Sequence, residues 1–535
     1  MEDVSPAVRR EVATVLAHVK NARCRALLVP LIHDVDSEVA RVAIRSAHML
    51  APADILLVPA LIARLGHRVL KPVAREALST YGDHGCEVLA HVLSDAQENR
   101  WIRRHVPGTL ARIPRQRSLD ILLGASADPD GFVRFKALAA VERLHRQYAH
   151  LLVNRETVER RLIEDVKKYH GVLTLRFNLG RHDQLSERSL LERAFDDKLR
   201  RIADRIFRLL ALIQPWKEVE AARSALGHRK GPQGPHDGIT NDRRAAVAAV
   251  EYFDNIVSHS LRKWLMPILD DMPMAERVRI ANTLLRTRPR DLEDTVAQLV
   301  HDDDRVISAG AIQFVWKRRM LALVHDLEYV RDHARIDDAL VSNSASWALD
   351  TWSSPDVPVL PLPIIEVVDR LRRIPLFERL SVDEMVRIAN LGSQLTYSSG
   401  DTILNEGVTA ERVVCLLDRP VSLATGQVYR ELRAPAVLAF DEMLERQQLR
   451  ETVIALDYAA CLALRVDDFL AMISDDIQVV QGLFRTLLGS ADERHHVPVH
   501  SAPRTVALAH RHTGSLKPLE KLFVPNRIHC WREGR

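Results

Sequence analysis

The sequence predicts a mainly α protein in which a long row of helical repeats is followed by a smaller α+β domain. Three observations predict this fold class. A short motif recurs at a near-constant interval along the first 150 residues. Glycine and proline are scarce, with 21 and 25 among 535 residues, which disfavours a chain built mostly of tight β-turns. After a proline-rich stretch near residue 360, the hydrophobic period changes from that of helices to that of strands.

The recurring motif has an acidic or polar turn, then an aliphatic residue beside arginine, then small residues. Its anchor positions are 31, 34, 29 and 31 residues apart, at Val8, Val39, Val73, Ile102 and Val133. This interval fits pairs of antiparallel helices, each too small to bury its apolar face alone. An acidic residue before a motif, such as Asp36, is suited to cap the following helix. Pro129 is suited to the first turn of the helix that carries the last anchor.

The motif resembles that of HEAT repeats. The resemblance implies an α-solenoid over residues 1–150, with a protein partner bound on its surface. The motif returns at 302–309, so residues 151–352 are expected to form an irregular HEAT-like region. Long helices are expected there over 190–210 and 242–261.

Residues 353–363 contain four prolines and are expected to form a linker without helix. A short helix is expected over 364–373. Ser381 then precedes the helical pattern of 382–391 and has Glu384 three residues later, which predicts a capping box.

Period-2 alternation with turn residues follows. It predicts strands over 395–407, 413–417, 421–424, 452–456 and 460–464, with a closing helix from Val466. This order, with Ile374–Phe377, Gly400-Asp401 and Phe440–Met443, resembles a cyclic-nucleotide-binding domain. The resemblance implies an eight-stranded β-roll flanked by helices over residues 364–490.

The resemblance also implies a phosphate-binding cassette and a ligand, cAMP or cGMP. The candidate ligand-binding residues are Phe440, Glu442, Met443, Arg450 and Thr452. In the family, a glutamate takes the ribose hydroxyl and an arginine pairs with the cyclic phosphate. Backbone N–H groups at the start of a short helix receive the same phosphate.

The cassette departs from the family pattern at several positions. Asp441 replaces a glycine beside the phosphate, and Leu449 stands where the arginine belongs if the pattern is aligned on Thr452. Glu451 adds a charge that is expected to repel phosphate. Arg419-Pro420 replaces a hairpin glycine. Two alternatives stay open: a roll that binds a cyclic nucleotide, and a degenerate roll that acts through contacts with the solenoid.

Charge and cysteine content exclude several function classes. The net charge of +4 is carried by residues 491–535, a histidine-rich segment expected to be a disordered tail, and the remaining residues are formally neutral. A specific nucleic-acid footprint is therefore not expected. The five cysteines have no CxxC or zinc-finger spacing, so neither a disulfide framework nor a metal site is expected. No catalytic motif and no run of about 18 apolar residues occurs, so neither an enzyme nor a membrane span is expected.

These observations predict a non-enzymatic regulatory or scaffold protein of the cytoplasm, with no cofactor other than the cyclic nucleotide considered above. Segments 207–210 and 244–255 resemble bacterial proteins that fuse a nucleotide-carrier-like membrane domain to HEAT repeats and a cyclic-nucleotide-binding domain. The resemblance implies an alternative: the cytosolic regulatory portion of a nucleotide-transporter-like system, held at the membrane by a transporter partner.

Overall fold

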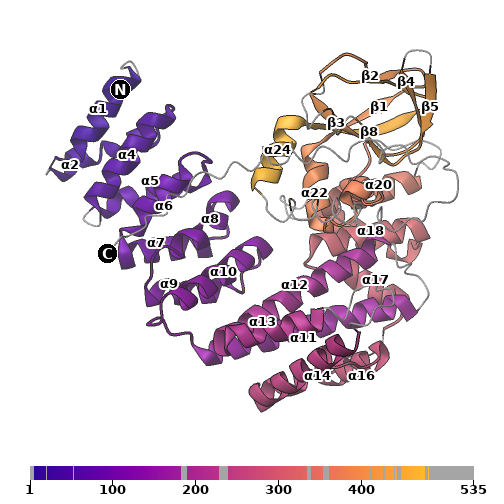
Figure 1. The fold of residues 1–535 in the computed structure, drawn as a ribbon, viewed down its shortest axis with the longest axis horizontal. Helices are drawn as coiled ribbons and strands as arrows, with labels where there is room; N and C mark the ends of the chain where they lie inside the picture. The colour runs from indigo at the N-terminus through magenta and orange to yellow at the C-terminus, as the bar shows by residue number, and fades with distance from the viewer. Residues whose placement is uncertain are drawn as a thin grey trace. The chain divides into compact units, whose positions relative to one another are not determined.

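Two compact units make up the computed structural model (Figure 1). One comprises Met1–Phe177 with Leu199–Arg288, and the other comprises Asn178–Lys198 with Pro289–Arg535. The residues that the structure describes are 5–19, 21–51, 54–181, 189–227, 239–288, 290–333, 339–353, 361–409, 411–425, 428–438, 440, 442, 447–475, 480 and 483. Most of the predicted linker and the whole predicted tail lie outside these residues. The last helices of the predicted region 151–352 lie in the same unit as the strands, and the predicted domain ranges stay predictions.

The first unit begins with two alternating rows of helices. One row contains the sequence anchors and comprises α1 (Pro6–Leu16), α4 (Ser37–Leu50), α6 (Lys71–Ser79), α8 (Arg100–Leu110) and α10 (Gly131–Gln147). The other row comprises α3 (Leu28–Ile32), α5 (Val58–Ala63), α7 (Gly82–Ser94) and α9 (Gln116–Ala125), with the short α2 (Ala22–Arg25), η1 (Ile55–Leu57) and η2 (Arg64–Gly66) between. Each helix contacts the next in its own row, which agrees with the helix pairs expected from the repeat.

Acidic caps begin two helices of the anchor row, α4 and α10. The Asp36 carboxylate accepts hydrogen bonds from the backbone N–H groups of Glu38 and Val39, and that of Asp130 accepts one from Phe132. The sequence predicts Pro129 in the first turn of α10. This is wrong, because Asp130 is the N-cap and α10 begins only at Gly131.

Hydrogen bonds between successive helical pairs have nearly the spacing of the sequence repeat. Arg9 Nε donates to Asp34 at 2.7 Å and Arg103 Nη2 to Asp128 at 2.8 Å, each across 25 residues. On the other row, Cys86 Sγ lies 3.0 Å from Ser118 Oγ, 32 residues away. Each pair is therefore tied to its neighbour in sequence.

Among the described residues, six further helices make up the rest of the first unit: α11 (Arg155–Arg181), α12 (Leu190–Ile213), α13 (Trp216–Gly227), α14 (Ile239–Ile256), α15 (His259–Leu269) and α16 (Met274–Leu285). Residues 178–181 of α11 and 190–198 of α12 belong to the second unit. The predicted continuous helix over 242–261 is wrong, because the backbone of Ser258 is extended (φ −62°, ψ 151°) and separates α14 from α15. Arg262 pairs with Asp254 across this break.

The second unit contains α17 (Leu292–Val300), α18 (Arg305–Arg318), η4 (Leu321–Leu323), α19 (Val324–His333), α20 (Ala339–Ser353), α21 (Ile364–Leu371), η5 (Pro375–Phe377) and α22 (Val382–Leu391). Every residue of α18 from Val306 to Val315 is buried. The predicted capping box is confirmed, because the side chains of Ser381 and Glu384 each accept a hydrogen bond from the other's backbone N–H.

In the described part of the chain, the roll has eight strands: β1 (Ser393–Tyr397), β2 (Thr402–Leu404), β3 (Arg412–Leu416), β4 (Val421–Thr425), β5 (Val428–Leu432), β6 (Ala436–Leu438), β7 (Thr452–Ala455) and β8 (Ala459–Arg465). They form two antiparallel sheets, ordered β1-β8-β3-β6 and β2-β7-β4-β5. α24 (Val466–Asp475) follows β8. An apolar cluster that includes Leu416, Val421 and Val453 fills the core. The predicted fold class, mainly α with a smaller α+β domain, is confirmed.

The hairpin between β3 and β4 supports a prediction about stability. Arg419 has φ 59°, in the left-handed region, and its exposed guanidinium lies 3.8 Å from Asp457. We expect Arg419→Gly to raise the free energy of unfolding by about 0.5 kcal/mol, because relief of this conformation outweighs the greater backbone entropy of glycine. Urea denaturation measures this change. The matched control is Arg412→Gly on β3, which is expected to destabilise the protein. A loss of stability at position 419 equal to that at position 412 would contradict the prediction.

Candidate functional site

The predicted cassette lies between β6 and β7. Phe440 and Glu442 are both half-buried. The backbone N–H of Gln447 donates to the carbonyl of Glu442 at 2.8 Å. Met443 lies outside the described residues, and its predicted role stays a prediction.

Arg450 is exposed and lies next to Glu442. Its Nη2 donates to Gln447 Oε1 at 2.9 Å, and its Nε lies 4.0 Å from Glu442 Oε1. The Arg450 side chain is 58% exposed, whereas that of Glu442 is 20% exposed. The structure therefore brings these two predicted residues together, but as a loose ion pair in which the carboxylate already offsets the cation.

Leu449 occupies the inward position. Its side chain is buried, its backbone N–H donates to the Val408 carbonyl, and its own carbonyl accepts from the Gly407 N–H, both at 2.8 Å. Gly407 has φ 80°, which suits a residue without a Cβ atom. The chain at the family's arginine position is thus fixed by backbone pairing and carries an apolar side chain.

Two further polar residues of the cassette, Thr452 and Glu451, have hydrogen-bond partners. Thr452 Oγ1 accepts from the backbone N–H of Glu406 at 3.2 Å. Both carboxylate oxygens of Glu451 accept from Arg430 Nη2, at 2.9 and 2.8 Å. The expectation that Glu451 repels phosphate therefore needs correction, because Arg430 offsets its charge. The sequence analysis missed Arg430 because it did not predict β5.

The core of the roll is apolar and disfavours charge. Burial raises the pKa of the Cys415 thiol and of the Cys461 thiol to about 12. Burial also raises the pKa of Tyr397, at the edge of the core. A phosphate entering this space would lose its hydration without gaining a cation. Within the described ranges, there is no group of three or more His, Cys, Asp or Glu side chains that could hold a metal ion.

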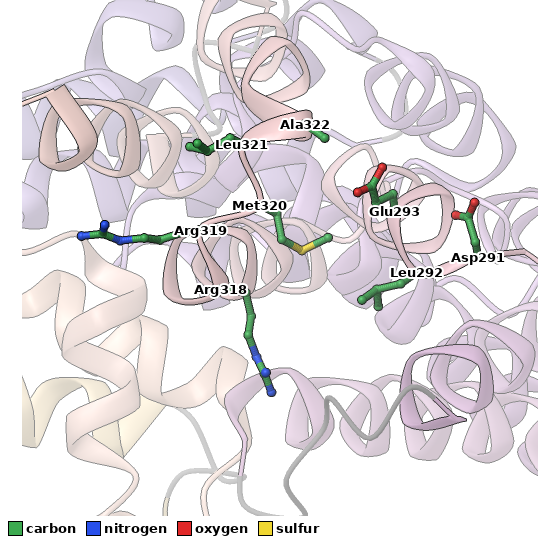
Figure 2. Close-up of a pocket in the computed structure, with 8 residues that line it drawn as sticks. All are labelled: Asp291, Leu292, Glu293, Arg318, Arg319, Met320, Leu321 and Ala322. Atoms are coloured by element: carbon green, nitrogen blue, oxygen red, sulfur yellow. The ribbon is translucent and has the colours of Figure 1, made fainter.

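A hollow of about 660 Å³ lies in the second unit, between the start of α17 and the turn after α18 (Figure 2). Met320 points across it towards Leu292 and Glu293, while the Arg318 and Arg319 side chains point away in different directions. The nearby Asp291 carboxylate caps α17 by accepting from the Asp294 N–H at 2.8 Å. The polar groups do not converge on one point, so the hollow lacks the geometry of a binding site.

A polar network joins α18 to α21, the first helix after the predicted linker. Lys317 Nζ lies 2.9 Å from Asp369 Oδ2 and 3.6 Å from Glu366 Oε1, and Gln313 donates to Glu366. Both carboxylates are almost fully buried, at 5% exposure for Glu366 and 2% for Asp369. We call this group of four side chains the junction network.

Two further arginines pair with the junction network. Arg372 Nη2 lies 2.7 Å and Arg373 Nη2 lies 2.9 Å from oxygens of Asp369. Burial by itself would raise the pKa of Asp369, but Lys317 and Arg372 together lower it below the usual range. Asp369 is therefore a buried anion that is held by several cations.

The first turns of α12 make a second connection within the same unit. Arg193 donates to the carbonyls of Glu378 and Leu380, just before α22. The buried Asp197 carboxylate accepts from the backbone N–H of Val382 at 2.9 Å, at the first position of α22. A carboxylate at a helix N-terminus also interacts favourably with the helix dipole. The helical region and the start of the roll domain are thus joined through charged and polar groups.

Among the helices of the described residues, none is both long and apolar enough to cross a bilayer.

Comparisons with known proteins match only a part of this chain. No protein-family model and no curated protein matches it. Solved structures do match, each over about a quarter of the chain. The N-terminal domain of a transcriptional regulator from Streptomyces coelicolor is 21% identical, with a TM-score of 0.23 over 24% of this chain and 98% of that one.

Two other solved structures are similar to the same extent. The catabolite activator protein of Thermus thermophilus is 21% identical, with a TM-score of 0.20 over 23% of this chain and 60% of that one. A putative cyclic nucleotide-binding protein from Geobacter metallireducens is 17% identical, with a TM-score of 0.21 over 24% of this chain and 97% of that one.

Proposed function

We propose that this chain is a non-catalytic regulatory scaffold. In this proposal its HEAT-like repeats bind a protein partner, and its cyclic-nucleotide-binding-like domain regulates that surface through contacts with the helices. The junction network carries the proposal, because it places buried charges between α18 and the first helix of the roll domain. Buried charged pairs hold two elements in one register and are costly to break, so a shift of α21 would be transmitted to α18.

We further propose that the cassette is degenerate. Three observations support this: the apolar Leu449 is buried at the arginine position, the Arg450 cation is offset by Glu442, and the Thr452 hydroxyl is used by the Glu406 backbone. A cyclic phosphate would have to break the Arg450 contacts and would gain only an exposed cation in return. The roll would then act through its contacts and not through uptake of a nucleotide.

Isothermal titration calorimetry of the full chain with cAMP and with cGMP tests this part of the proposal. We expect no binding heat and no shift of the melting temperature at ligand concentrations up to about 1 mM, a limit that corresponds to about 4 kcal/mol of binding free energy. A domain that binds cAMP with known affinity, assayed in the same buffer, is the positive control.

An Arg450→Ala variant makes the result decisive. If the wild type binds either nucleotide and Arg450→Ala abolishes that binding, the cassette is functional and the proposed degeneracy is wrong. If neither protein binds, the degenerate cassette stands. Melting curves of both proteins show that the variant is folded, which is expected because the Arg450 side chain is largely exposed.

A further inference from the structure

Exposed aromatic side chains gather on two neighbouring helices of the anchor row, α8 and α10. Trp101 on α8 is 63% exposed, and Phe132 and Phe135 on α10 are each 36% exposed. α8 and α10 contact one another within the first unit. Large aromatic surfaces left in water at adjacent positions are typical of sites that bind another molecule.

Cations lie over these rings. The Arg104 guanidinium is 5.1 Å from the centre of the Phe132 ring and 5.7 Å from that of Trp101. Lys136 Nζ is 5.2 Å from the centre of the Phe132 ring and 5.8 Å from that of Phe135. We call this group of five side chains, on α8 and α10, the aromatic-basic strip. A surface of this kind offers an anionic ligand both charge and apolar contact.

The surroundings of the strip are also positive. His105, which follows Arg104 on α8, has its pKa lowered to about 4 by burial and by the nearby charges of Lys71, Arg75, Lys136 and Arg104. These cations come from α6, α8 and α10. Arg75 Nη2 donates to the His105 carbonyl at 3.4 Å, so α6 adjoins the strip. The positive potential therefore extends over three successive helices of the anchor row.

The two rows of the repeat region differ in charge. The helices α1, α4, α6, α8 and α10 contain 13 Lys or Arg and four Asp or Glu residues. The helices α3, α5, α7 and α9 contain one Arg and three Asp or Glu residues. The positive charge belongs to one row only, as expected for a binding face and not for a uniformly solvated surface.

We propose that the aromatic-basic strip binds an acidic peptide segment of a partner protein. The carboxylates of the segment would pair with Lys136 and with the cations of α6, and its apolar side chains would pack on Trp101, Phe132 and Phe135. This inference deepens the partner-binding half of the proposed function and does not depend on the roll.

A peptide fits the strip better than a nucleic acid does. Arg104 Nε already pairs with Asp130 at 3.0 Å, and Arg103 pairs with Asp128 at 2.8 Å. Arg103 and Arg104 are therefore already offset, whereas a polymer that carries a phosphate at every residue needs an uninterrupted run of available cations. A peptide can place neutral side chains next to Asp128 and Asp130 and its acids elsewhere.

Fluorescence anisotropy with a defined probe tests the proposal. The probe is a fluorescein-labelled 16-residue peptide with four repeats of Glu-Glu-Leu-Pro, added to the full chain at low salt. We expect saturable binding that weakens as ionic strength rises. Lys136→Glu is expected to weaken binding about tenfold, because it replaces attraction by repulsion, and Trp101→Ala by a similar factor.

Two controls distinguish binding at the aromatic-basic strip from nonspecific electrostatic binding. Lys263→Glu makes the same charge change on an exposed side chain of α15 and is expected to leave the affinity unchanged. A peptide with Lys in place of Glu is expected not to bind. Three results would each overturn the proposal: no binding at about 1 mM probe, equal losses of affinity for the variants at positions 136 and 263, or tighter binding of a labelled 20-residue single-stranded DNA. Calorimetry of the full chain with cyclic nucleotides is independent of all these results, so failure of one proposal is distinguishable from failure of the other.

Discussion

Replacement of Asp369 by alanine is expected to lower the local stability of the second unit by about 2–3 kcal/mol, below the range for a fully buried ion pair because Lys317 and Arg373 keep contact with water. The carboxylate is 2% exposed and lies against Lys317, Arg372 and Arg373. Without it, these cations lose their shared anion, and Glu366 remains 3.6 Å from Lys317. Hydrogen exchange of peptides that cover α18 and α21 measures the change, because it reports local opening free energies.

The matched control for this substitution is Asp332→Ala. Asp332 pairs with Arg331 at the surface of α19, in the same unit. Its loss is expected to leave the local stability essentially unchanged, as for other exposed ion pairs. Similar exchange rates in the two variants would show that the junction network contributes little, and the proposed coupling would lose its basis.

The pH dependence of this effect has a defined sign. The pKa of Asp369 is lowered in the folded protein, so its contribution to stability is fully present above the ordinary aspartate pKa of about 3.9 and is lost as the pH falls through the folded value. The difference in stability between wild type and Asp369→Asn should thus be constant from pH 7 to about pH 5 and should shrink below about pH 4. A difference that grows on acidification would contradict this assignment.

Asp197→Ala is expected to cost about 2–3 kcal/mol, because it leaves the buried Val382 N–H without its carboxylate acceptor and removes a favourable charge from the start of α22. Hydrogen exchange is expected to rise at the first turn of α22 before it rises elsewhere in the roll. Asp197→Asn, which keeps an acceptor oxygen, should lose less than half as much.

The comparison variant for Asp197 lies on the same helix. Asp204 lies on α12 and is a half-exposed partner of Arg223 on α13. We expect Asp204→Ala to leave hydrogen exchange at α22 unchanged. If Asp204→Ala and Asp197→Ala gave the same result at α22, the effect would come from α12 as a helix and not from the Asp197 contact.

The sequence predicted the features that depend on local pattern. The repeat interval located the helices of the anchor row, and the Ser381/Glu384 capping box was found because both partners lie within one helical turn. β5 and β6 were not predicted, since both are short and lie among charged and turn residues. The boundary at Ser258 was missed because the sequence there has no glycine or proline to mark it.

The site was predictable only in part, for a physical reason. The resemblance identified Glu442 and Arg450, and the structure places them side by side. It could not show that Arg430 offsets Glu451, because those residues lie 21 positions apart and meet only across the sheet. The junction network joins residues 52 positions apart for the same reason, and no local pattern marks Lys317 or Asp369 as partners.

The contacts of α12 also have a consequence for the order of assembly during synthesis. The helical pairs of the first unit are joined over 25 to 32 residues, so each can close soon after it leaves the ribosome. Asp197 is made 185 residues before Val382, the backbone group that it binds. At synthesis rates of about 5–20 residues per second, the first turns of α12 wait on the order of ten seconds or more for that partner. In a nascent chain, the helical array of the first unit therefore forms before the Asp197 carboxylate can meet the Val382 N–H. Synthesis of α22 then completes the second unit.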